Sequence, residues 1–275
     1  MDPLQTTIAG INIWEPPTAL TDLIVTIVCA ISYVKLYKGL PRDKQYERQF
    51  LNFFLFMGLC TLTGALMTHA FPYAFHYDGV LRPDQYRDLP WIERLTANYH
   101  NLPNWICNII SVTFFAYASV NRAHSILSNK SIKTIRIAIA IESLVVLIAT
   151  LYKYTFLFAE IHIGVALLIF SAPLQIQVWK NFKRKDAPFI LLATFITLFV
   201  PMVLIGKMQF SEWFNHNDIS HILIASAMTA FYFAGRHWIR EYNTERVFIS
   251  LTMRICQYLK PATLGNRRSI HRKWK

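Results

Sequence analysis

The chain has 275 residues, of which 54% are hydrophobic and 16% are charged, and its mean hydropathy is +0.30. This apolar content exceeds what one water-soluble core of this length needs, so we expect a membrane protein. Cys29, Cys60 and Cys107 lie inside apolar runs, and none of the four cysteines has a metal-binding or redox spacing, so no disulfide is expected. Residues 1–17 lack a basic start and a cleavage site, so no removable signal peptide is predicted.

Seven apolar stretches approach the roughly 20 residues that cross the hydrocarbon of a bilayer. They are residues 18–37, 51–71, 104–121, 135–152, 155–178, 187–206 and 219–238. Only Tyr152–Tyr154 separates the fourth from the fifth, which predicts a tight turn between two antiparallel helices. Pro173 and Pro201 fall inside spans and predict kinks. We therefore expect an all-α, seven-helix transmembrane domain over residues 1–238, followed by a basic tail over 239–275.

The distribution of basic residues predicts the orientation. Of the 28 lysines and arginines, all but five lie in segments that alternate onto one side of the membrane. Those segments are residues 35–50, 122–136, 180–186 and 236–275. The positive-inside rule places this side in the cytoplasm, so we expect the N-terminus outside and the C-terminus inside.

The net charge of +12 is concentrated on the cytoplasmic side, where anionic lipid headgroups are a nearer partner than nucleic acid. In the tail, apolar residues recur at helical spacing from Val247 to Leu259, which predicts an interfacial amphipathic helix. The polybasic end that follows, residues 264–275, favours membrane anchoring, with regulatory docking as the alternative.

Ionisable side chains inside spans are costly and need a reason. Four predicted spans place such residues, with an asparagine beside them, in the outer third of the membrane: Asp22, His69, Glu160, His162, His216, Asn217, Asp218 and His221. A common depth is what a polar site between helices requires. The motif FNHNDISH at the start of the seventh span is the densest cluster, because it offers four of these residues in six positions.

Each of these residues also has a structural interpretation. Asp22 could be an acid favoured by the helix dipole, and His69 an interfacial histidine. Glu160 and His162 point about 200° apart on a helix, so at most one faces a given pocket, and His162 is the better inward candidate. The seventh-span cluster could be an Asn or Asp cap beside a buried His221.

Imidazoles and carboxylates from separate helices can hold Zn²⁺ and activate a water for attack on a carbonyl. The candidate metal ligands are His69, His221, His216 and His162, and the candidate catalytic acids are Asp218 and Asp22. Asn217, His100 and Glu160 complete the predicted pocket. A metal-free acid/base pair is the alternative. The chain has no glycine-rich phosphate loop, no H-E-x-x-H and no G-x-S-x-G motif.

Three motifs resemble those of an uncharacterised family of bacterial seven-helix membrane proteins: PTALTDL, GALMTHAF and FNHNDISH. The resemblance spans most of the chain and implies the bacterial inner membrane as its location, but no activity. More distantly, the seven spans, their orientation and the histidines of the second and seventh spans resemble the CREST superfamily of hydrolases and receptors, which includes alkaline ceramidases and adiponectin-type receptors.

The resemblance to the CREST superfamily implies a zinc site in which His69 and His221 are ligands. The chain departs from that pattern at three places. Ala65 occupies the position of the superfamily's serine, Asn217 that of the first seventh-span histidine, and residues 104–121 contain no aspartate. A related pocket would then be rebuilt with Asp22, His100, Asp218 or His162.

Two functions follow from these residues. The first is an intramembrane metal-dependent hydrolase of a lipid amide or ester, with His69, His221 and Asp218 as ligands. The second is a non-enzymatic receptor or membrane-complex subunit whose cluster is structural or binds a ligand. A haem or proton-relay role needs histidines spread through the bilayer, and their common depth argues against it. The aromatic-rich outer loop, residues 71–104, is either an interfacial belt or a lid.

Overall fold

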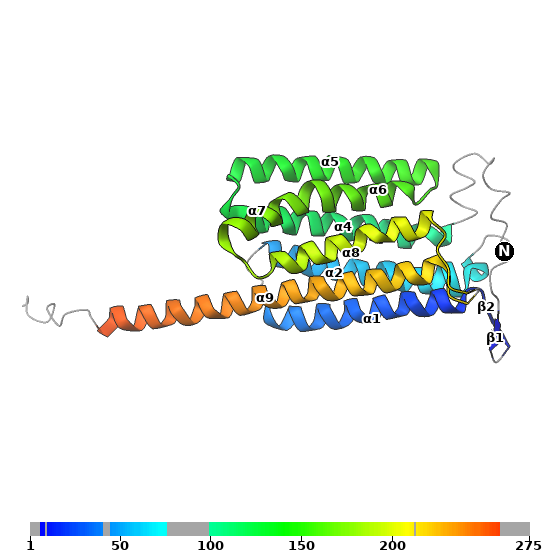
Figure 1. Ribbon diagram of the computed structural model, residues 1–275, viewed down its shortest axis with the longest axis horizontal. Coiled ribbons are helices and arrows are strands. Elements are labelled where there is room, and N and C mark those ends of the chain that lie inside the picture. Colours follow the sequence, from blue (N-terminus) through cyan, green and yellow to red (C-terminus); the bar gives the residue numbers. More distant parts are fainter. Residues whose placement is uncertain (1–5, 9, 41–44, 76–98, 212, 259–275) are drawn as a thin grey trace, which may run out of the picture.

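The computed structural model describes residues 6–8, 10–40, 45–75, 99–211 and 213–258, which fold into a bundle of helices (Figure 1). A short antiparallel hairpin, β1 (Thr6–Ile8) and β2 (Ile11–Ile13), precedes the bundle. Gly10 has a φ of +80° in the hairpin turn, a conformation that favours glycine.

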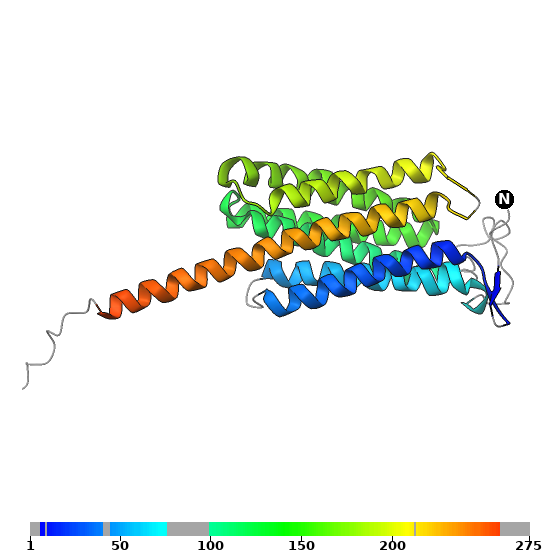
Figure 2. The ribbon, with the colours of Figure 1, turned by 60° about the horizontal axis from the view of Figure 1, so that its bottom comes forward.

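Seven helical rods run along one common axis (Figures 1 and 2). The α-helical segments are α1 (Pro16–Gly39), α2 (Gln45–Thr63), α4 (Leu102–Arg122), α5 (Asn129–Lys153), α6 (Leu157–Val165), α7 (Ala172–Phe182), α8 (Ala187–Ile205) and α9 (His216–Tyr258). Two π-helical segments continue or join them: η1 (Gly64–Ala70) extends α2, and η5 (Ala166–Ser171) links α6 to α7. Three short 3₁₀ turns complete the described part: η2 (Pro72–Phe75), η3 (Tyr99–Asn101) and η4 (Ala123–Ser125).

Five of the rods in the described part of the chain are long and apolar enough to cross a membrane. They are Pro16–Gly39, Gln45–Ala70, Asn129–Lys153, Leu157–Phe182 and Ala187–Ile205. This is the composition of a multi-pass membrane protein. The all-helical prediction is confirmed, and these five rods match five of the predicted spans closely.

The other two rods, α4 and α9, contain more polar residues and lie where those residues face other helices. α4 packs along α2, and α9 packs against both α1 and α8. Asn108 and Ser111 on α4, and Asp218 and Ser220 on α9, are buried. The lower hydropathy of these two rods therefore reflects their contacts with protein rather than with lipid.

The predicted tight turn between the fourth and fifth spans is confirmed. α5 ends at Lys153, Tyr154 adopts the left-handed conformation with a φ of +49°, and α6 begins at Leu157. Pro173 lies in the first turn of α7, directly after η5, where its missing N–H is tolerated. Pro201 lies inside α8, which continues to Ile205.

The predicted C-terminal interfacial helix is not a separate element. α9 runs unbroken from His216 to Tyr258, and its second half extends beyond the bundle (Figures 1 and 2). The physical reason is visible in the sequence: residues 239–258 contain neither glycine nor proline, so nothing ends the helix after the seventh rod.

Close helix contacts hold α9 against α1 and α2. A Cβ on Gly235 would lie 2.8 Å from a Leu36 methyl group and 3.0 Å from the Phe50 ring. A Cβ on Gly39 would lie 2.6 Å from Ile239. Small residues at these positions let the backbones approach, as in packed membrane helices.

A charged network joins α4, α8 and α9 at the end of the bundle opposite the hairpin. Arg122 Nε lies 3.4 Å from Asp186 Oδ2, and its guanidinium also donates to Tyr46 Oη at 3.2 Å and contacts Glu241. Trp238 Nε1 donates to the same Asp186 oxygen. Arg122 and Asp186 are both buried. Asp186 also pairs with Arg184, whose Nε lies 3.3 Å from Oδ1, so two guanidinium groups balance its buried charge.

Replacing Asp186 with alanine should lower the free energy of unfolding by about 3 kcal/mol or more, because the buried Arg122 would lose its buried partner and keep only the partly exposed Glu241 as an acidic partner. Thermal unfolding in a non-ionic detergent measures the loss. Glu241→Gln is the matched control, because the Glu241 side chain is 43% exposed and its pairing with Arg122 should contribute less than about 1 kcal/mol. Equal melting temperatures for the two variants would contradict the assignment.

Candidate metal centre

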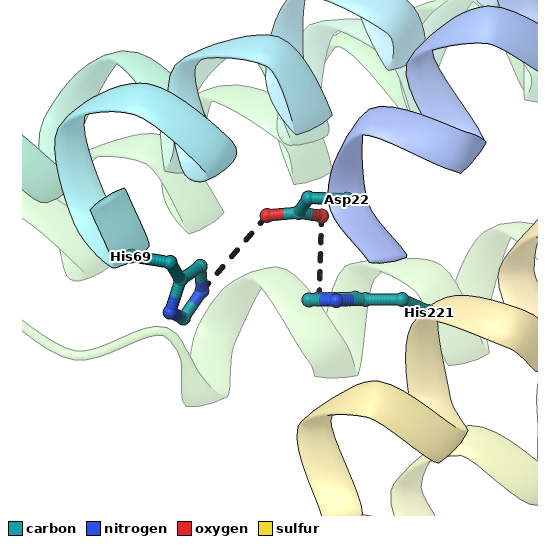
Figure 3. Close-up of side chains that lie close together, drawn as sticks. All are labelled: Asp22, His69 and His221. Atoms are coloured by element: carbon teal, nitrogen blue, oxygen red, sulfur yellow. Dashed lines mark ion pairs between the residues drawn. The ribbon is translucent and has the colours of Figure 1, made fainter. Parts of the chain in front are cut away.

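Asp22 on α1, His69 on η1 and His221 on α9 converge at the hairpin end of the bundle (Figure 3). His221 Nε2 lies 3.3 Å from Asp22 Oδ1, and His69 Nε2 lies 3.9 Å from Asp22 Oδ2. One ligand atom from each of the three residues lies within 4.8 Å of the other two. This Asp–His–His triad is a donor set that suits a divalent transition metal.

The π-helical turn η1 positions His69. The N–H of Phe71 donates to the carbonyl of Leu66 at 2.9 Å, the wide hydrogen bond that defines such a turn. Gly64, at its start, leaves room for Asp22, because a Cβ there would lie only 2.6 Å from Asp22 Oδ2. π-turns inside α-helices frequently occur at functional sites. Here the turn brings both the second-span histidine and a glycine to Asp22.

Glu15 fixes the orientation of the His69 ring. Its Oε2 lies 2.6 Å from His69 Nδ1, so Nδ1–H donates to the carboxylate and Nε2 faces Asp22. The backbone N–H of Glu15 donates to the carbonyl of His69 at 2.8 Å, and that of Trp14 to Ala70 at 3.1 Å. A carboxylate behind the ring is the usual support of a metal-bound histidine.

Thr21 orients His221 in the same way. Thr21 Oγ1 donates to the carbonyl of Thr18 at 3.0 Å, and His221 Nδ1 lies 3.1 Å from the same hydroxyl. Because the hydroxyl proton goes to Thr18, the hydroxyl oxygen accepts from Nδ1–H of His221. Nε2 of His221 then faces Asp22, so both imidazoles present the nitrogen that a metal would bind.

Asp218 supports this arrangement from behind instead of joining the triad. Its Oδ1 lies 3.4 Å from Thr21 Oγ1, and its Oδ2 accepts from the backbone N–H of Asn215 at 2.7 Å. The backbone N–H of Asn217 donates to Asn215 Oδ1 at 2.8 Å, which caps the start of α9. The structure thus gives Asp218, predicted as a catalytic acid or ligand, a capping and supporting role.

A cavity of about 570 Å³ opens from the triad into the bundle. Its polar lining includes Asn104, Asn108, Glu160, His216, Asn217 and Ser220. Its apolar lining includes Phe53, Met57, Phe115, Met228 and Phe231. Along α9 the lining runs from His216 to Phe231, about 22 Å at the rise of an α-helix. The cavity is therefore elongated, with a polar outer end and an apolar inner end.

The structure brings six of the nine predicted site residues to this cavity: Asp22, His69, His221, His216, Asn217 and Glu160. Among the described residues, His162 and His100 are not part of its wall, although both are buried. The wall also excludes Asp218. Most of the predicted lid, residues 76–98, lies outside the described residues.

The prediction that His162, and not Glu160, faces the pocket is wrong. His162 Nδ1 lies 2.7 Å from Glu142 Oε2 on α5, and its Nε2 lies 3.2 Å from Thr113 Oγ1 on α4. The two residues do point apart, as the helical geometry requires, but Glu142 attracts His162 to the other side. Glu160 is the one that lines the cavity.

Three residues that shape the triad site were not predicted from the sequence. Glu15 lies before the first span, where no periodicity marks it. Gly64 becomes important only through its distance to Asp22. Asn104 was recognisable as a polar residue inside a predicted span, and it accepts a hydrogen bond from Cys60 Sγ at 2.8 Å beside the triad.

Residues 17–240 match a family of unknown function, DUF6962. The chain belongs to this family. The DUF6962 match includes the whole triad and, from the charged network, Arg122, Asp186 and Trp238. Glu15 lies two residues before its start, and Glu241 directly follows its end. No curated protein and no solved structure matches the chain.

Gly64→Ala should displace Asp22 and reduce metal binding, because the added methyl group would lie 2.6 Å from Asp22 Oδ2 and 3.1 Å from Asn104 Nδ2. Metal content per protein, measured by elemental analysis after zinc loading and desalting, should fall well below the wild-type value. Gly164→Ala is the matched control, because a Cβ there meets nothing within 4 Å. Equal metal content in both variants would contradict the geometry.

Removing Glu15 should weaken zinc binding about 10–100-fold, the usual effect of losing the group behind a ligating histidine. Competition with a chromophoric chelator measures the affinity of Glu15→Ala. Glu15→Gln should lose less, because its amide oxygen can still accept from His69 Nδ1–H. The assignment fails if the alanine variant binds zinc as tightly as the wild type.

Proposed function

We propose that the protein is a metal-dependent hydrolase in the membrane that cleaves an amide or ester bond of a lipid. The observation that supports this most is the Asp–His–His triad at the mouth of an elongated, largely apolar cavity. Both histidines are held through Nδ1 and present Nε2 inward. A merely structural cluster would not need this shared orientation toward a cavity.

In the proposed topology all seven rods cross the membrane, including α4 and α9, with the N-terminus outside and the C-terminus in the cytoplasm. The alternation of basic segments supports this orientation. The bacterial inner membrane is the proposed location, on the basis of the motif resemblance described above. The triad then lies near the outer leaflet and the charged network near the cytoplasmic leaflet.

Zinc bound by the triad would polarise the scissile carbonyl and lower the pKa of a bound water to about 7. The chain's own residues would do the rest. The apolar inner end of the cavity would hold the acyl chain, and the polar outer end would orient the bond to be cleaved. Burial of the triad, with Asp22 only 2% exposed, would keep bulk water from competing with the substrate for the metal.

The distant resemblance to the CREST superfamily supports the same proposal through His69 and His221. Asp22 would supply from the first span the carboxylate that the superfamily has at its third span. Ala65 replaces the superfamily's serine and is fully buried. A shared mechanism would therefore have to operate without a hydroxyl at that position.

The alternative function is a non-enzymatic receptor or complex subunit. One observation favours it: in the other tautomer, with the proton on Nε2, His221 would donate to Asp22 Oδ1 at 3.3 Å and accept from the Thr21 hydroxyl through Nδ1. Such a network could hold α1 and α9 together without a metal. Elemental analysis separates the two functions.

The purified wild type, loaded with zinc and desalted, should retain about one zinc per chain, and His221→Ala should retain less than about a tenth of that. His237→Ala, on the same helix but at the opposite end of the bundle from the triad, is the control and should retain the wild-type amount. Only the wild type and the control should hydrolyse p-nitrophenyl dodecanoate in mixed micelles, and chelation should abolish the activity. A metal-free wild type would refute the hydrolase in favour of the receptor.

A further inference from the structure

Glu160 is an acid in the cavity wall that the proposed chemistry does not use. It lies in the first turn of α6, is half-buried, and lines the cavity. Among the described residues, no lysine, arginine or histidine forms an ion pair with its carboxylate, whereas Asp22, Glu142 and Asp186 each have such a partner. The start of a helix favours an acid, but this accounts for only part of the cost of a charge in a membrane wall.

The cavity has an open space beside Glu160, which we call the opening. Gly164, one turn further along α6, also lines the cavity, and a Cβ there would meet nothing within 4 Å. Pro201 and Leu204 of α8 line the same cavity. A lipid headgroup would have room in this space, next to the Glu160 carboxylate.

The charges of the lining favour one class of headgroup. Within the described part of the chain, no lysine or arginine lines the cavity. A phosphate group would find no fixed cation away from the triad. Asp22 is flanked by His69 and His221, which leaves Glu160 as the acid that a cationic ligand group could pair with.

We propose that the substrate is a lipid with a protonated amine in its headgroup, and that Glu160 binds this amine. This inference rests on the proposed function, because it names the substrate class of the same site. The acyl chain would occupy the inner end, against the packed rings of Phe53 and Phe231, and the amine would stay near the opening. Glu160 is thus a specificity residue and not the acceptor of the reaction's proton.

Three single-chain probes test the binding preference in non-ionic micelles: dodecylammonium, dodecanol and dodecyl phosphate. We measure how much each raises the melting temperature of the zinc-loaded protein. In the wild type, dodecylammonium should bind about tenfold more tightly than dodecanol, through a charge-assisted hydrogen bond, and dodecyl phosphate should bind least. Equal shifts for the amine and the alcohol would overturn the proposal.

Glu160→Gln should remove the preference for the amine and leave the dodecanol shift and the zinc content unchanged. Glu142→Gln, outside the cavity, is the matched control and should keep the preference. Gly164→Leu, which fills the opening, should weaken both probes and provides a second variant that leaves the carboxylate in place. An amine preference that survives Glu160→Gln would also overturn the proposal.

Kinetics distinguish specificity from proton transfer. With p-nitrophenyl dodecanoate, which has no amine, Glu160→Gln should keep the wild-type kcat. With 4-(aminomethyl)phenyl dodecanoate, which carries its amine on the headgroup side of the ester, the same variant should show a KM raised by about tenfold. A loss of kcat on both esters would assign Glu160 to proton transfer and overturn this inference, while the zinc-dependent hydrolase itself would stand.

Discussion

The carboxylate of Asp22, buried between helices of a membrane protein, is the constraint on which the site depends. A charge in this position is costly unless it is paired and hydrogen-bonded. His69 and His221 approach it from two other helices, and the chain leaves room for it with Gly64. A divalent cation between the three side chains would balance this charge, in keeping with the proposed zinc site.

The cost of leaving a polar side chain without a partner also explains which helices are polar. α4 and α9 lie against α2, α1 and α8, and their polar side chains point at the cavity or at buried partners. The outer rods, such as α5, expose Ile141, Leu144 and Ile148 to the surroundings. The two rods of lowest hydropathy are therefore the ones whose polar side chains face other helices, and one of them, α9, carries His221 of the triad.

Periodicity and hydropathy were sufficient to predict the rods, because each is long and bounded by polar turns. Topology then predicted that Asp22, His69 and His221 share one end of the bundle, and they do. Rotation about a helix axis was not predictable: Glu160 and His162 exchanged roles because Glu142 on α5 pairs with His162. Glu15 was missed for a different reason, since a residue between a hairpin and a helix belongs to no repeating pattern.

α9 connects the two ends of the molecule. At one end its His221 contacts Asp22, and at the other its Trp238 donates to Asp186, with Gly235 packed against Leu36 between them. A helix held at two separate points cannot slide or rotate without breaking a buried polar contact, each of which is costly to lose. The cavity between these two anchors can therefore persist as an open space, since neighbouring helices are not free to collapse into it. A preformed site of this kind spends little binding energy on ordering the protein.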